Sequence, residues 1–243
     1  MTHKTKGIVL RTVKYGETSL VVTIFTELFG VQTYMVNGVR SSKSKTSKAN
    51  YFLPGAILDM VAYYHEQKSM QRIKEFGWSV LYKDVLSNVI KNSIALYMVE
   101  LLYKCLKQPE QNTDLFSFCE EALLQLDVAD KKATANFPLY FTLHLPQFFG
   151  FRINDNYSEA ISILDLQEGS FEPVIPHHPH FIDGENAFIT SQILKTMQPG
   201  ELTEINLNQE LRRKLLLQYQ DYYALHIPEF GQMKTLAVLH EVL

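Results

Sequence analysis

The segment from Asn37 to Lys48 contains the residues whose types and spacing point most directly to chemistry. Its four cations alternate with small hydroxyl residues directly after an apolar run: Arg40, Lys43, Lys45 and Lys48. Cations neutralise phosphates, and hydroxyl groups donate hydrogen bonds to phosphate oxygens. The segment therefore predicts contact with a nucleic-acid backbone, although an isolated loop of this composition is more often a solvated turn.

Neighbouring residues favour the nucleic-acid interpretation. The preceding stretch adds three cations, Lys6, Arg11 and Lys14, and three aromatic residues, Tyr15, Phe29 and Tyr34. Unpaired bases stack on aromatic rings at about 1–3 kcal/mol each. We take Tyr34 and seven cations as candidate DNA contacts. The cations are Lys6, Arg11, Lys14, Arg40, Lys43, Lys45 and Lys48. Each aromatic residue taken singly could equally belong to the core or to the rim of the fold.

A second basic cluster, Arg212-Arg213-Lys214, lies near the expected start of a helix. Cations at that end oppose the helix dipole and mildly destabilise the helix unless they have a partner. They are possible secondary contacts for DNA or for an acidic peptide. A salt-bridged surface explains them slightly better.

The stretch His177-His178-Pro179-His180 resembles a metal site, which Asp183 could complete. Adjacent histidines in extended chain point to opposite faces, and Pro179 stiffens the segment. We therefore expect a solvated proline-rich loop and no metal.

Enzyme motifs are missing from the sequence. It has no phosphate-binding glycine loop, no G-x-S-x-G, no H-E-x-x-H and no dinucleotide fingerprint. Cys105 and Cys119 lie on apolar helix faces and are expected to be buried packing residues. The sequence therefore predicts no enzyme and no cofactor.

Five short β-strands are expected to position the basic residues. They are Gly7–Val13, Ser19–Thr26, Val31–Val36, about Ala56–Tyr64 and a weaker Met70–Phe76. A sheet of this size removes its edges by closing, which favours a small barrel over a sandwich.

After Trp78 the apolar period changes to that of helices. Helices are expected at Leu86–Cys105, Leu115–Leu126, Phe137–Phe149, from a cap at Asn206 or Asn208 to Tyr222, and at about Gln232–Val242. A short hairpin of Ile161–Leu166 and Phe171–Ile175 interrupts them. The prediction is an α+β chain with a β-barrel over 1–79 and a mostly helical part over 80–243, in which 153–187 is a hairpin insertion.

Composition and charge set the broad class. The chain has 243 residues, 46% of them hydrophobic, and no apolar run is long enough for a membrane helix. Residues 1–50 contain eight Lys/Arg and two Asp/Glu, whereas residues 108–190 contain three Lys/Arg and thirteen Asp/Glu. This asymmetry favours a polyanion partner for the basic end, with simple mutual neutralisation as the alternative. With two cysteines and no secretory signal, we expect a cytoplasmic protein.

Several motifs resemble the RecO family of bacterial recombination-repair mediators. At the N-terminus they are Lys6-Gly-Ile-Val-Leu-Arg-Thr12, Tyr15-Gly-Glu-Thr-Ser19, Thr23-Ile-Phe-Thr26 and Asn37-Gly-Val-Arg40. At the C-terminus they are Leu211-Arg-Arg-Lys-Leu-Leu216, Tyr222-Tyr223 and Met233-Lys-Thr-Leu-Ala-Val-Leu239. The middle of the chain matches more loosely, through Phe137 to Phe151.

The resemblance implies an N-terminal OB-fold and a helical C-terminal domain. It implies binding of single- and double-stranded DNA, annealing of complementary strands, and help in loading recombinase onto strands covered by single-strand-binding protein. The partners implied are a RecR-type ring mediator and the acidic tail of single-strand-binding protein, in the cytoplasm at the nucleoid. Arg11, Arg40 and the following lysines would contact DNA.

One departure concerns zinc. Many family members carry a four-cysteine module after the helix that here ends near Gly150, but this chain has no cysteine beyond Cys119. A hairpin without metal is expected in its place. A rival hypothesis from another class is a protein-interaction adaptor, in which the barrel binds a protein and the acidic middle docks a basic partner.

Overall fold

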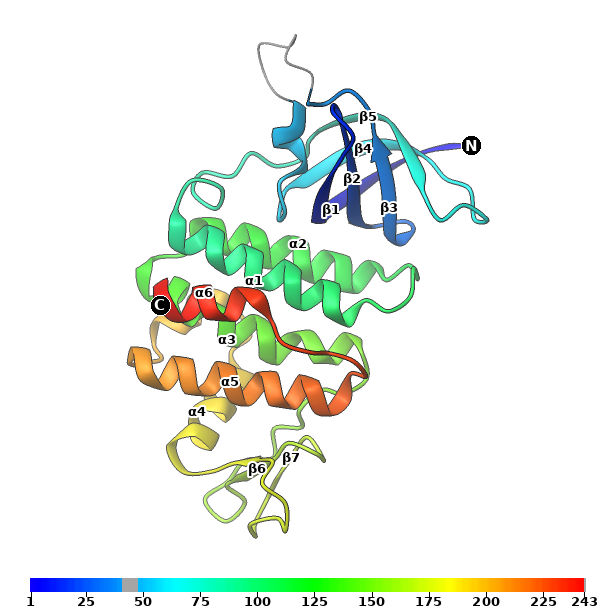
Figure 1. Cartoon of the computed structure of the whole chain (residues 1–243). Helices are drawn as coiled ribbons and strands as arrows, with labels where there is room; N and C mark the ends of the chain where they lie inside the picture. Colours follow the sequence, from blue (N-terminus) through cyan, green and yellow to red (C-terminus); the bar gives the residue numbers. More distant parts are fainter. Residues whose placement is uncertain (41–47, 243) are drawn as a thin grey trace. The chain divides into compact units, whose positions relative to one another are not determined.

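Five strands close into a barrel in the order β1-β2-β3-β5-β4 (Figure 1). They are β1 (Thr2–Tyr15), β2 (Ser19–Thr26), β3 (Gly30–Val36), β4 (Ile57–Tyr63) and β5 (Gln71–Trp78). The computed structural model describes residues 1–40 and 48–242, so the candidate contacts Lys43 and Lys45 lie outside the described residues. The predicted barrel is confirmed, although β1 begins at Thr2 and not at Gly7.

Alternating residues of each strand point inward and fill the barrel, as the two-residue period of a strand requires. The buried set includes Val9, Leu20, Val22, Ile24, Tyr34, Val36, Leu58, Met60 and Ala62. Because these inward residues are apolar, burial of this face fixes the register of the sheet.

β1 is long because it pairs with two neighbours in turn. Its first half, from Thr2 to Ile8, pairs with β4, and its second half, from Gly7 to Tyr15, pairs with β2. A register shift between Val9 and Arg11 marks a β-bulge, which bends the strand between its two partners.

The barrel closes through a short parallel contact between β3 and β5, in which Tyr34 pairs with Gln71 and Met35 with Arg72. The other neighbouring strands of the barrel are antiparallel. This strand order is that of an OB-fold barrel, so the predicted fold class is confirmed. A short 3₁₀ helix, η1 (Lys48–Phe52), lies between β3 and β4 and buries Phe52.

The chain divides into two compact units, and the first contains Met1–Lys83 together with Leu106–Leu124. The second stretch brings most of α2 (Thr113–Val128) to the barrel, where the Phe116 ring packs 5.7 Å from the Phe25 ring. Gly30, at the start of β3, has φ +59° and leaves no room for a Cβ beside the backbone of Glu110. The sequence-based division of the chain at residue 79 stays a prediction.

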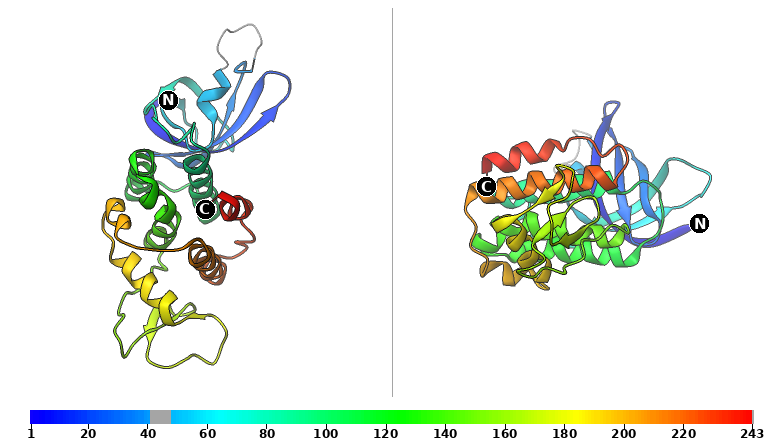
Figure 2. Two further views of the ribbon diagram at one scale, coloured as in Figure 1. Left: turned by 90° about the vertical axis from the view of Figure 1, so that its left-hand side faces the viewer. Right: turned by 90° about the horizontal axis from the view of Figure 1, so that it is seen from below.

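The second unit, Asp84–Cys105 with Gln125–Leu243, is mostly helical. Its helices are α1 (Val89–Cys105), α3 (Lys131–His144), α4 (Gly184–Lys195), α5 (Gln209–His226) and α6 (Lys234–Val242), with 3₁₀ turns η2 (Leu145–Phe148) and η3 (Pro199–Thr203). α3 packs against α1, α4 and α5, and α6 lies along α1 (Figures 1 and 2). Among the described residues, no helix is long and apolar enough to cross a bilayer.

The insertion forms a three-stranded sheet in the order β7-β6-β8. Its strands are β6 (Ile163–Asp165), β7 (Ser170–Glu172) and β8 (Phe181–Ile182). The predicted hairpin is present as β6 and β7. The sequence did not reveal β8, because a strand of two residues is too short to show the alternation of apolar and polar residues.

One predicted helix has different bounds in the structure, and another helix was not predicted. The predicted helix Phe137–Phe149 is wrong at both ends: α3 begins at Lys131, where the Asp130 side chain accepts hydrogen bonds from the backbone N–H groups of Lys132 and Ala133. It ends at His144, because Pro146 cannot continue the α-helical ladder and lies instead in η2. The helix α4 was missed, since it opens on the poor helix former Gly184 within the stretch interpreted as loop.

A carboxylate on α1 caps the last helix. Glu100 accepts hydrogen bonds from the backbone N–H of Lys234 (3.0 Å), the backbone N–H of Thr235 (2.8 Å) and the Thr235 hydroxyl (2.6 Å). Burial alone would raise the pKa of Glu100, but these hydrogen bonds and the nearby Lys104 hold it below its ordinary value. The start of α6 is therefore fixed by a charge supplied from another helix.

We expect Gly30→Ala to destabilise the protein more than Gly16→Ala. Both glycines have positive φ, which costs a side chain about 1–2 kcal/mol, but a Cβ at Gly16 meets nothing within 4 Å. The collision with Glu110 should add about 1–3 kcal/mol at Gly30. Urea unfolding of both variants measures the difference, and equal losses would contradict the packing described.

We expect Glu100→Gln to lower the free energy of unfolding at pH 7 by about 1 kcal/mol, the usual cost of losing a helix cap. Since the folded pKa of Glu100 is depressed, its contribution is present above its ordinary pKa and is lost as the pH falls through the folded value. The difference between wild type and variant should therefore shrink below about pH 4.5. A constant difference between pH 7 and pH 3.5 in urea unfolding would contradict this role.

Candidate nucleic-acid interface

The turn between β1 and β2 brings together cations from distant parts of the sequence. Arg40 donates from Nη1 to the carbonyl of Gly16 (3.2 Å) and from its backbone N–H to the carbonyl of Thr18 (3.0 Å). Lys14 and Tyr15 end β1 at the same turn, and both side chains are exposed. We call Lys14, Tyr15, Gly16 and Arg40 the basic turn. The exposed acidic residue Glu17 follows Gly16 directly.

The outward face of the sheet continues from this turn. Outward residues form two rows across the strands: Arg11, Thr23 and Thr33, and next to them Val13, Val21, Met35 and Arg72. Arg11 and Arg72 are exposed at opposite ends of these rows. We call these seven residues the outer face. It carries hydroxyl groups, small apolar side chains and two guanidinium groups, and no carboxylate.

Lys48 begins η1, and this short helix is held against β1. The Thr12 hydroxyl donates to the carbonyl of Phe52 over 2.6 Å. Lys48 is exposed. Apart from Lys6, the described candidate cations come from the second half of β1 and from the segment between β3 and β4: Arg11, Lys14, Arg40 and Lys48.

The selection of Tyr34 as a base-stacking residue is wrong. Its ring has no exposed surface, because the alternation of β3 turns it into the barrel. Burial raises the pKa of its phenol. Phe29 is also occupied, since its ring stacks on Tyr64 with 4.1 Å between centroids. Tyr15, by contrast, is 59% exposed and remains available to a base.

Lys6 lies in acidic surroundings. Its Nζ is 2.8 Å from Oε1 of Glu120, and this hydrogen bond raises the pKa of Lys6, with smaller contributions from Glu27 and Asp59. The ammonium is therefore already compensated by carboxylates, which a phosphate would have to displace.

The second basic cluster is largely engaged within its own unit. Arg212 donates from Nη1 to the carbonyl of Leu207 (2.6 Å), and burial lowers its pKa. Arg213 donates to the carbonyl of His240 near the end of α6. Lys214 is the most exposed of the three side chains. The arginines have a structural use that the sequence did not reveal.

The histidine stretch contacts the small sheet through His178. His178 Nε2 lies 3.2 Å from Oδ2 of the buried Asp165, and the His178 and His180 rings are 6.1 Å apart. Within residues 1–40 and 48–242 no cluster of three or more His, Cys, Asp or Glu side chains could hold a metal ion.

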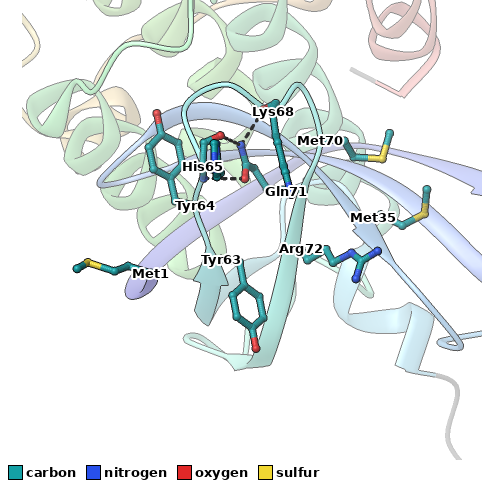
Figure 3. Close-up of a pocket in the computed structure, with 9 residues that line it drawn as sticks. All are labelled: Met1, Met35, Tyr63, Tyr64, His65, Lys68, Met70, Gln71 and Arg72. Carbon is teal, nitrogen blue, oxygen red and sulfur yellow. Dashed lines mark hydrogen bonds between the residues drawn. The ribbon is translucent and has the colours of Figure 1, made fainter.

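A hollow of about 670 Å³ opens beside the loop that joins β4 to β5 (Figure 3). Its lining comprises Met1, Met35, Tyr63, Tyr64, His65, Lys68, Met70, Gln71 and Arg72. We call it the β4–β5 hollow. The sequence did not single out any of these residues, because the parallel pairing that sets Arg72 beside Met35 leaves no local signal.

Comparison with known proteins gives one consistent family. The model "Recombination protein O N terminal" matches residues 1–79, and "Recombination protein O C terminal" matches residues 86–236. The chain is 30% identical over 243 residues to the DNA repair protein RecO of Azobacteroides pseudotrichonymphae, covering 100% of this chain and 99% of that one. It is 32% identical over 243 residues to the DNA repair protein RecO of Bacteroides fragilis, with the same coverage. For the DNA repair protein RecO of Christiangramia forsetii the identity is 31%, over 98% of both chains. This chain belongs to the RecO family of DNA repair proteins.

Proposed function

We propose that this chain is a non-enzymatic mediator of recombination repair that binds single- and double-stranded DNA and anneals complementary strands. Family membership supports a role in DNA repair. The observation that carries DNA binding is the gathering of Lys14, Tyr15 and Arg40 at one turn, next to an outer face free of carboxylates.

The mechanism is electrostatic. Two DNA strands repel each other through their phosphates, and a surface that neutralises phosphates lowers this repulsion. Arg40 is directed toward the turn by its two hydrogen bonds to Gly16 and Thr18, so its guanidinium keeps several donors for a phosphate. Backbone contacts of this kind carry no sequence information, which suits a protein that must act on any strand.

The partners in this proposal follow from the family. A RecR-type ring mediator and the acidic tail of single-strand-binding protein would bind the chain while it helps to load recombinase onto covered strands. The proposed place of action is the cytoplasm, at the nucleoid. DNA and the acidic tail would both be drawn to basic surfaces, whereas the acidic middle would suit a basic surface of another partner.

We expect the variant Arg11→Ala/Lys14→Ala/Arg40→Ala to bind DNA more weakly, because it removes three phosphate contacts. The loss should be similar for different sequences, and the slope of log Kd against log salt should fall by roughly one unit per contact removed. Fluorescence anisotropy of a labelled single strand between about 50 and 200 mM salt measures both. A second variant, Arg40→Ala/Lys43→Ala/Lys45→Ala, tests the segment from Asn37 to Lys48 in the same way.

The control for this experiment is Lys131→Ala, an exposed lysine of the helical unit that is not among the candidate contacts. An unchanged slope in the first variant would contradict the proposed interface. If that variant also lost a protein partner in pull-down experiments, the barrel would be an adaptor surface instead.

We expect Lys6→Ala to change the Kd for DNA by less than about twofold, or about 0.4 kcal/mol. Its ammonium is held by Glu120 at 2.8 Å, so its removal should cost no direct phosphate contact. Arg11→Ala is the matched comparison on the same strand. Equal losses in the two variants, measured in the same anisotropy titration, would show that Lys6 contacts DNA despite its partner.

A further inference from the structure

One stretch of the helical unit is almost free of basic residues. Between Arg152 and Arg212 the sequence has ten Asp/Glu and a single Lys/Arg, which is Lys195. The charge of Lys195 is already compensated, because its Nζ lies 3.6 Å from Oδ2 of Asp155 and 5.9 Å from the centre of the Tyr157 ring. This part of the chain therefore repels phosphates and attracts cations.

A groove with a volume of about 500 Å³ runs beside α4 in this stretch. One wall is a single face of the helix, because the α4 residues that line it recur at steps of one, three or four: Glu185, Phe188, Ile189, Gln192 and Lys195. The other wall begins in η3 and continues beyond it, through Glu201, Glu204 and Ile205. We call this feature the α4 groove.

The α4 groove exposes an aromatic ring. Phe188 is 46% exposed, and its ring lies 5.8 Å from the ring of Tyr157, which limits its freedom. Ile189 and Ile205 extend the apolar surface on the two walls. A ring that is already held in place loses little entropy when a second apolar side chain packs on it.

Three exposed carboxylates surround this apolar surface, and they belong to Glu185, Glu201 and Glu204. Glu201 and Glu204 are three residues apart across a 3₁₀ turn, a spacing at which side chains lie on the same side. Oε2 of Glu201 also accepts a hydrogen bond from the backbone N–H of Met197 (3.2 Å), which fixes the connection between α4 and η3. The described part of the groove thus has three carboxylates and one lysine that is already paired.

We propose that the α4 groove is a docking site for a basic segment of a partner protein. Lysine or arginine side chains of that segment meet Glu185, Glu201 and Glu204, and an apolar side chain between them packs on Phe188. Charge complementarity determines this choice of partner, since a nucleic-acid strand or an acidic peptide would be repelled. The inference goes beyond the proposed function, because it concerns a protein partner and a surface of the helical unit.

The apolar and the charged contacts have different parts in this proposal. Exposed ion pairs contribute little affinity each, but they speed association and reject partners of the wrong charge. The affinity of an interface comes mostly from a few buried anchors, which are often aromatic. We therefore assign the anchoring contact to Phe188 and the selection of a basic partner to the carboxylates.

The first test selects ligands without assuming a sequence. A library of short random peptides displayed on phage is selected on the full-length wild type and depleted on the full-length variant Phe188→Ala/Glu204→Gln. Depletion removes peptides that bind elsewhere on the chain. The peptides that remain should combine Lys or Arg with an apolar residue. Enrichment of acidic peptides, or of none, would overturn the proposal.

The second test measures the affinity of one selected peptide by fluorescence anisotropy. Phe188→Ala should weaken its binding about tenfold at every salt concentration, as the loss of an anchor does. Glu185→Gln/Glu204→Gln should weaken it about fivefold at low salt, and the difference should shrink as salt screens the charges. Because the glutamine variant keeps the size of two exposed side chains, its result does not depend on the folding of Phe188→Ala.

Matched controls remove the same groups outside the α4 groove. Glu159→Gln/Glu168→Gln removes two exposed carboxylates of the insertion, and Leu217→Ala truncates an apolar side chain that is 47% exposed. Both controls should bind the peptide like wild type. Losses equal to those of the groove variants would overturn the proposal, since they would show an effect of overall charge or stability.

A second copy of the chain is the rival occupant. Sedimentation of wild type and Phe188→Ala should give the same oligomeric state. A wild-type dimer that Phe188→Ala dissociates would show that a second copy fills the groove, and would overturn the proposal. None of these measurements uses DNA, so their failure is distinguishable from a failure of the proposed function.

Discussion

The parallel pairing of β3 with β5 is the constraint on which the barrel and its surfaces depend. Two residue pairs, Tyr34 with Gln71 and Met35 with Arg72, close the sheet. The first pair points inward, where the tyrosine is buried and the amide organises the β4–β5 loop. The second points outward and joins the outer face to the hollow. One short contact thereby sets the core, the loop and the outer face.

Electrostatic surroundings separate the cations into groups with different uses. Lys6 is compensated by Glu120, and Arg213 holds a carbonyl of α6, so these charges serve the fold. Arg11 and Lys14 are exposed on β1 beyond the bulge, and their cross-strand partners on β2, Thr23 and Leu20, are uncharged. Net charge alone does not distinguish these groups. What distinguishes the groups is the residue that lies next to each ammonium or guanidinium.

Sequence patterns predicted the strands and helices whose apolar residues recur with a clear period. They failed where contacts between residues far apart in the chain determine the position of a side chain. The five strands and the closed barrel followed from alternation and turn residues, since burial of one face imposes a period of two. The direction of Tyr34 did not follow, because period alone does not say which face is inward when both contain apolar residues. Nor did Arg72, whose position depends on a pairing across 37 residues of chain between Met35 and Arg72. The helix α4 was hidden by its opening glycine and by the loop-like stretch before it.

The central claim is that the outer face and the basic turn of the barrel contact DNA. Photo-cross-linking of the full-length chain to a single strand containing bromouracil, followed by mass spectrometry of the linked peptides, tests it most directly. The account predicts cross-links at Tyr15 in the basic turn and at Met35 on the outer face. Cross-links confined to the helical unit, for example to α5, would contradict it.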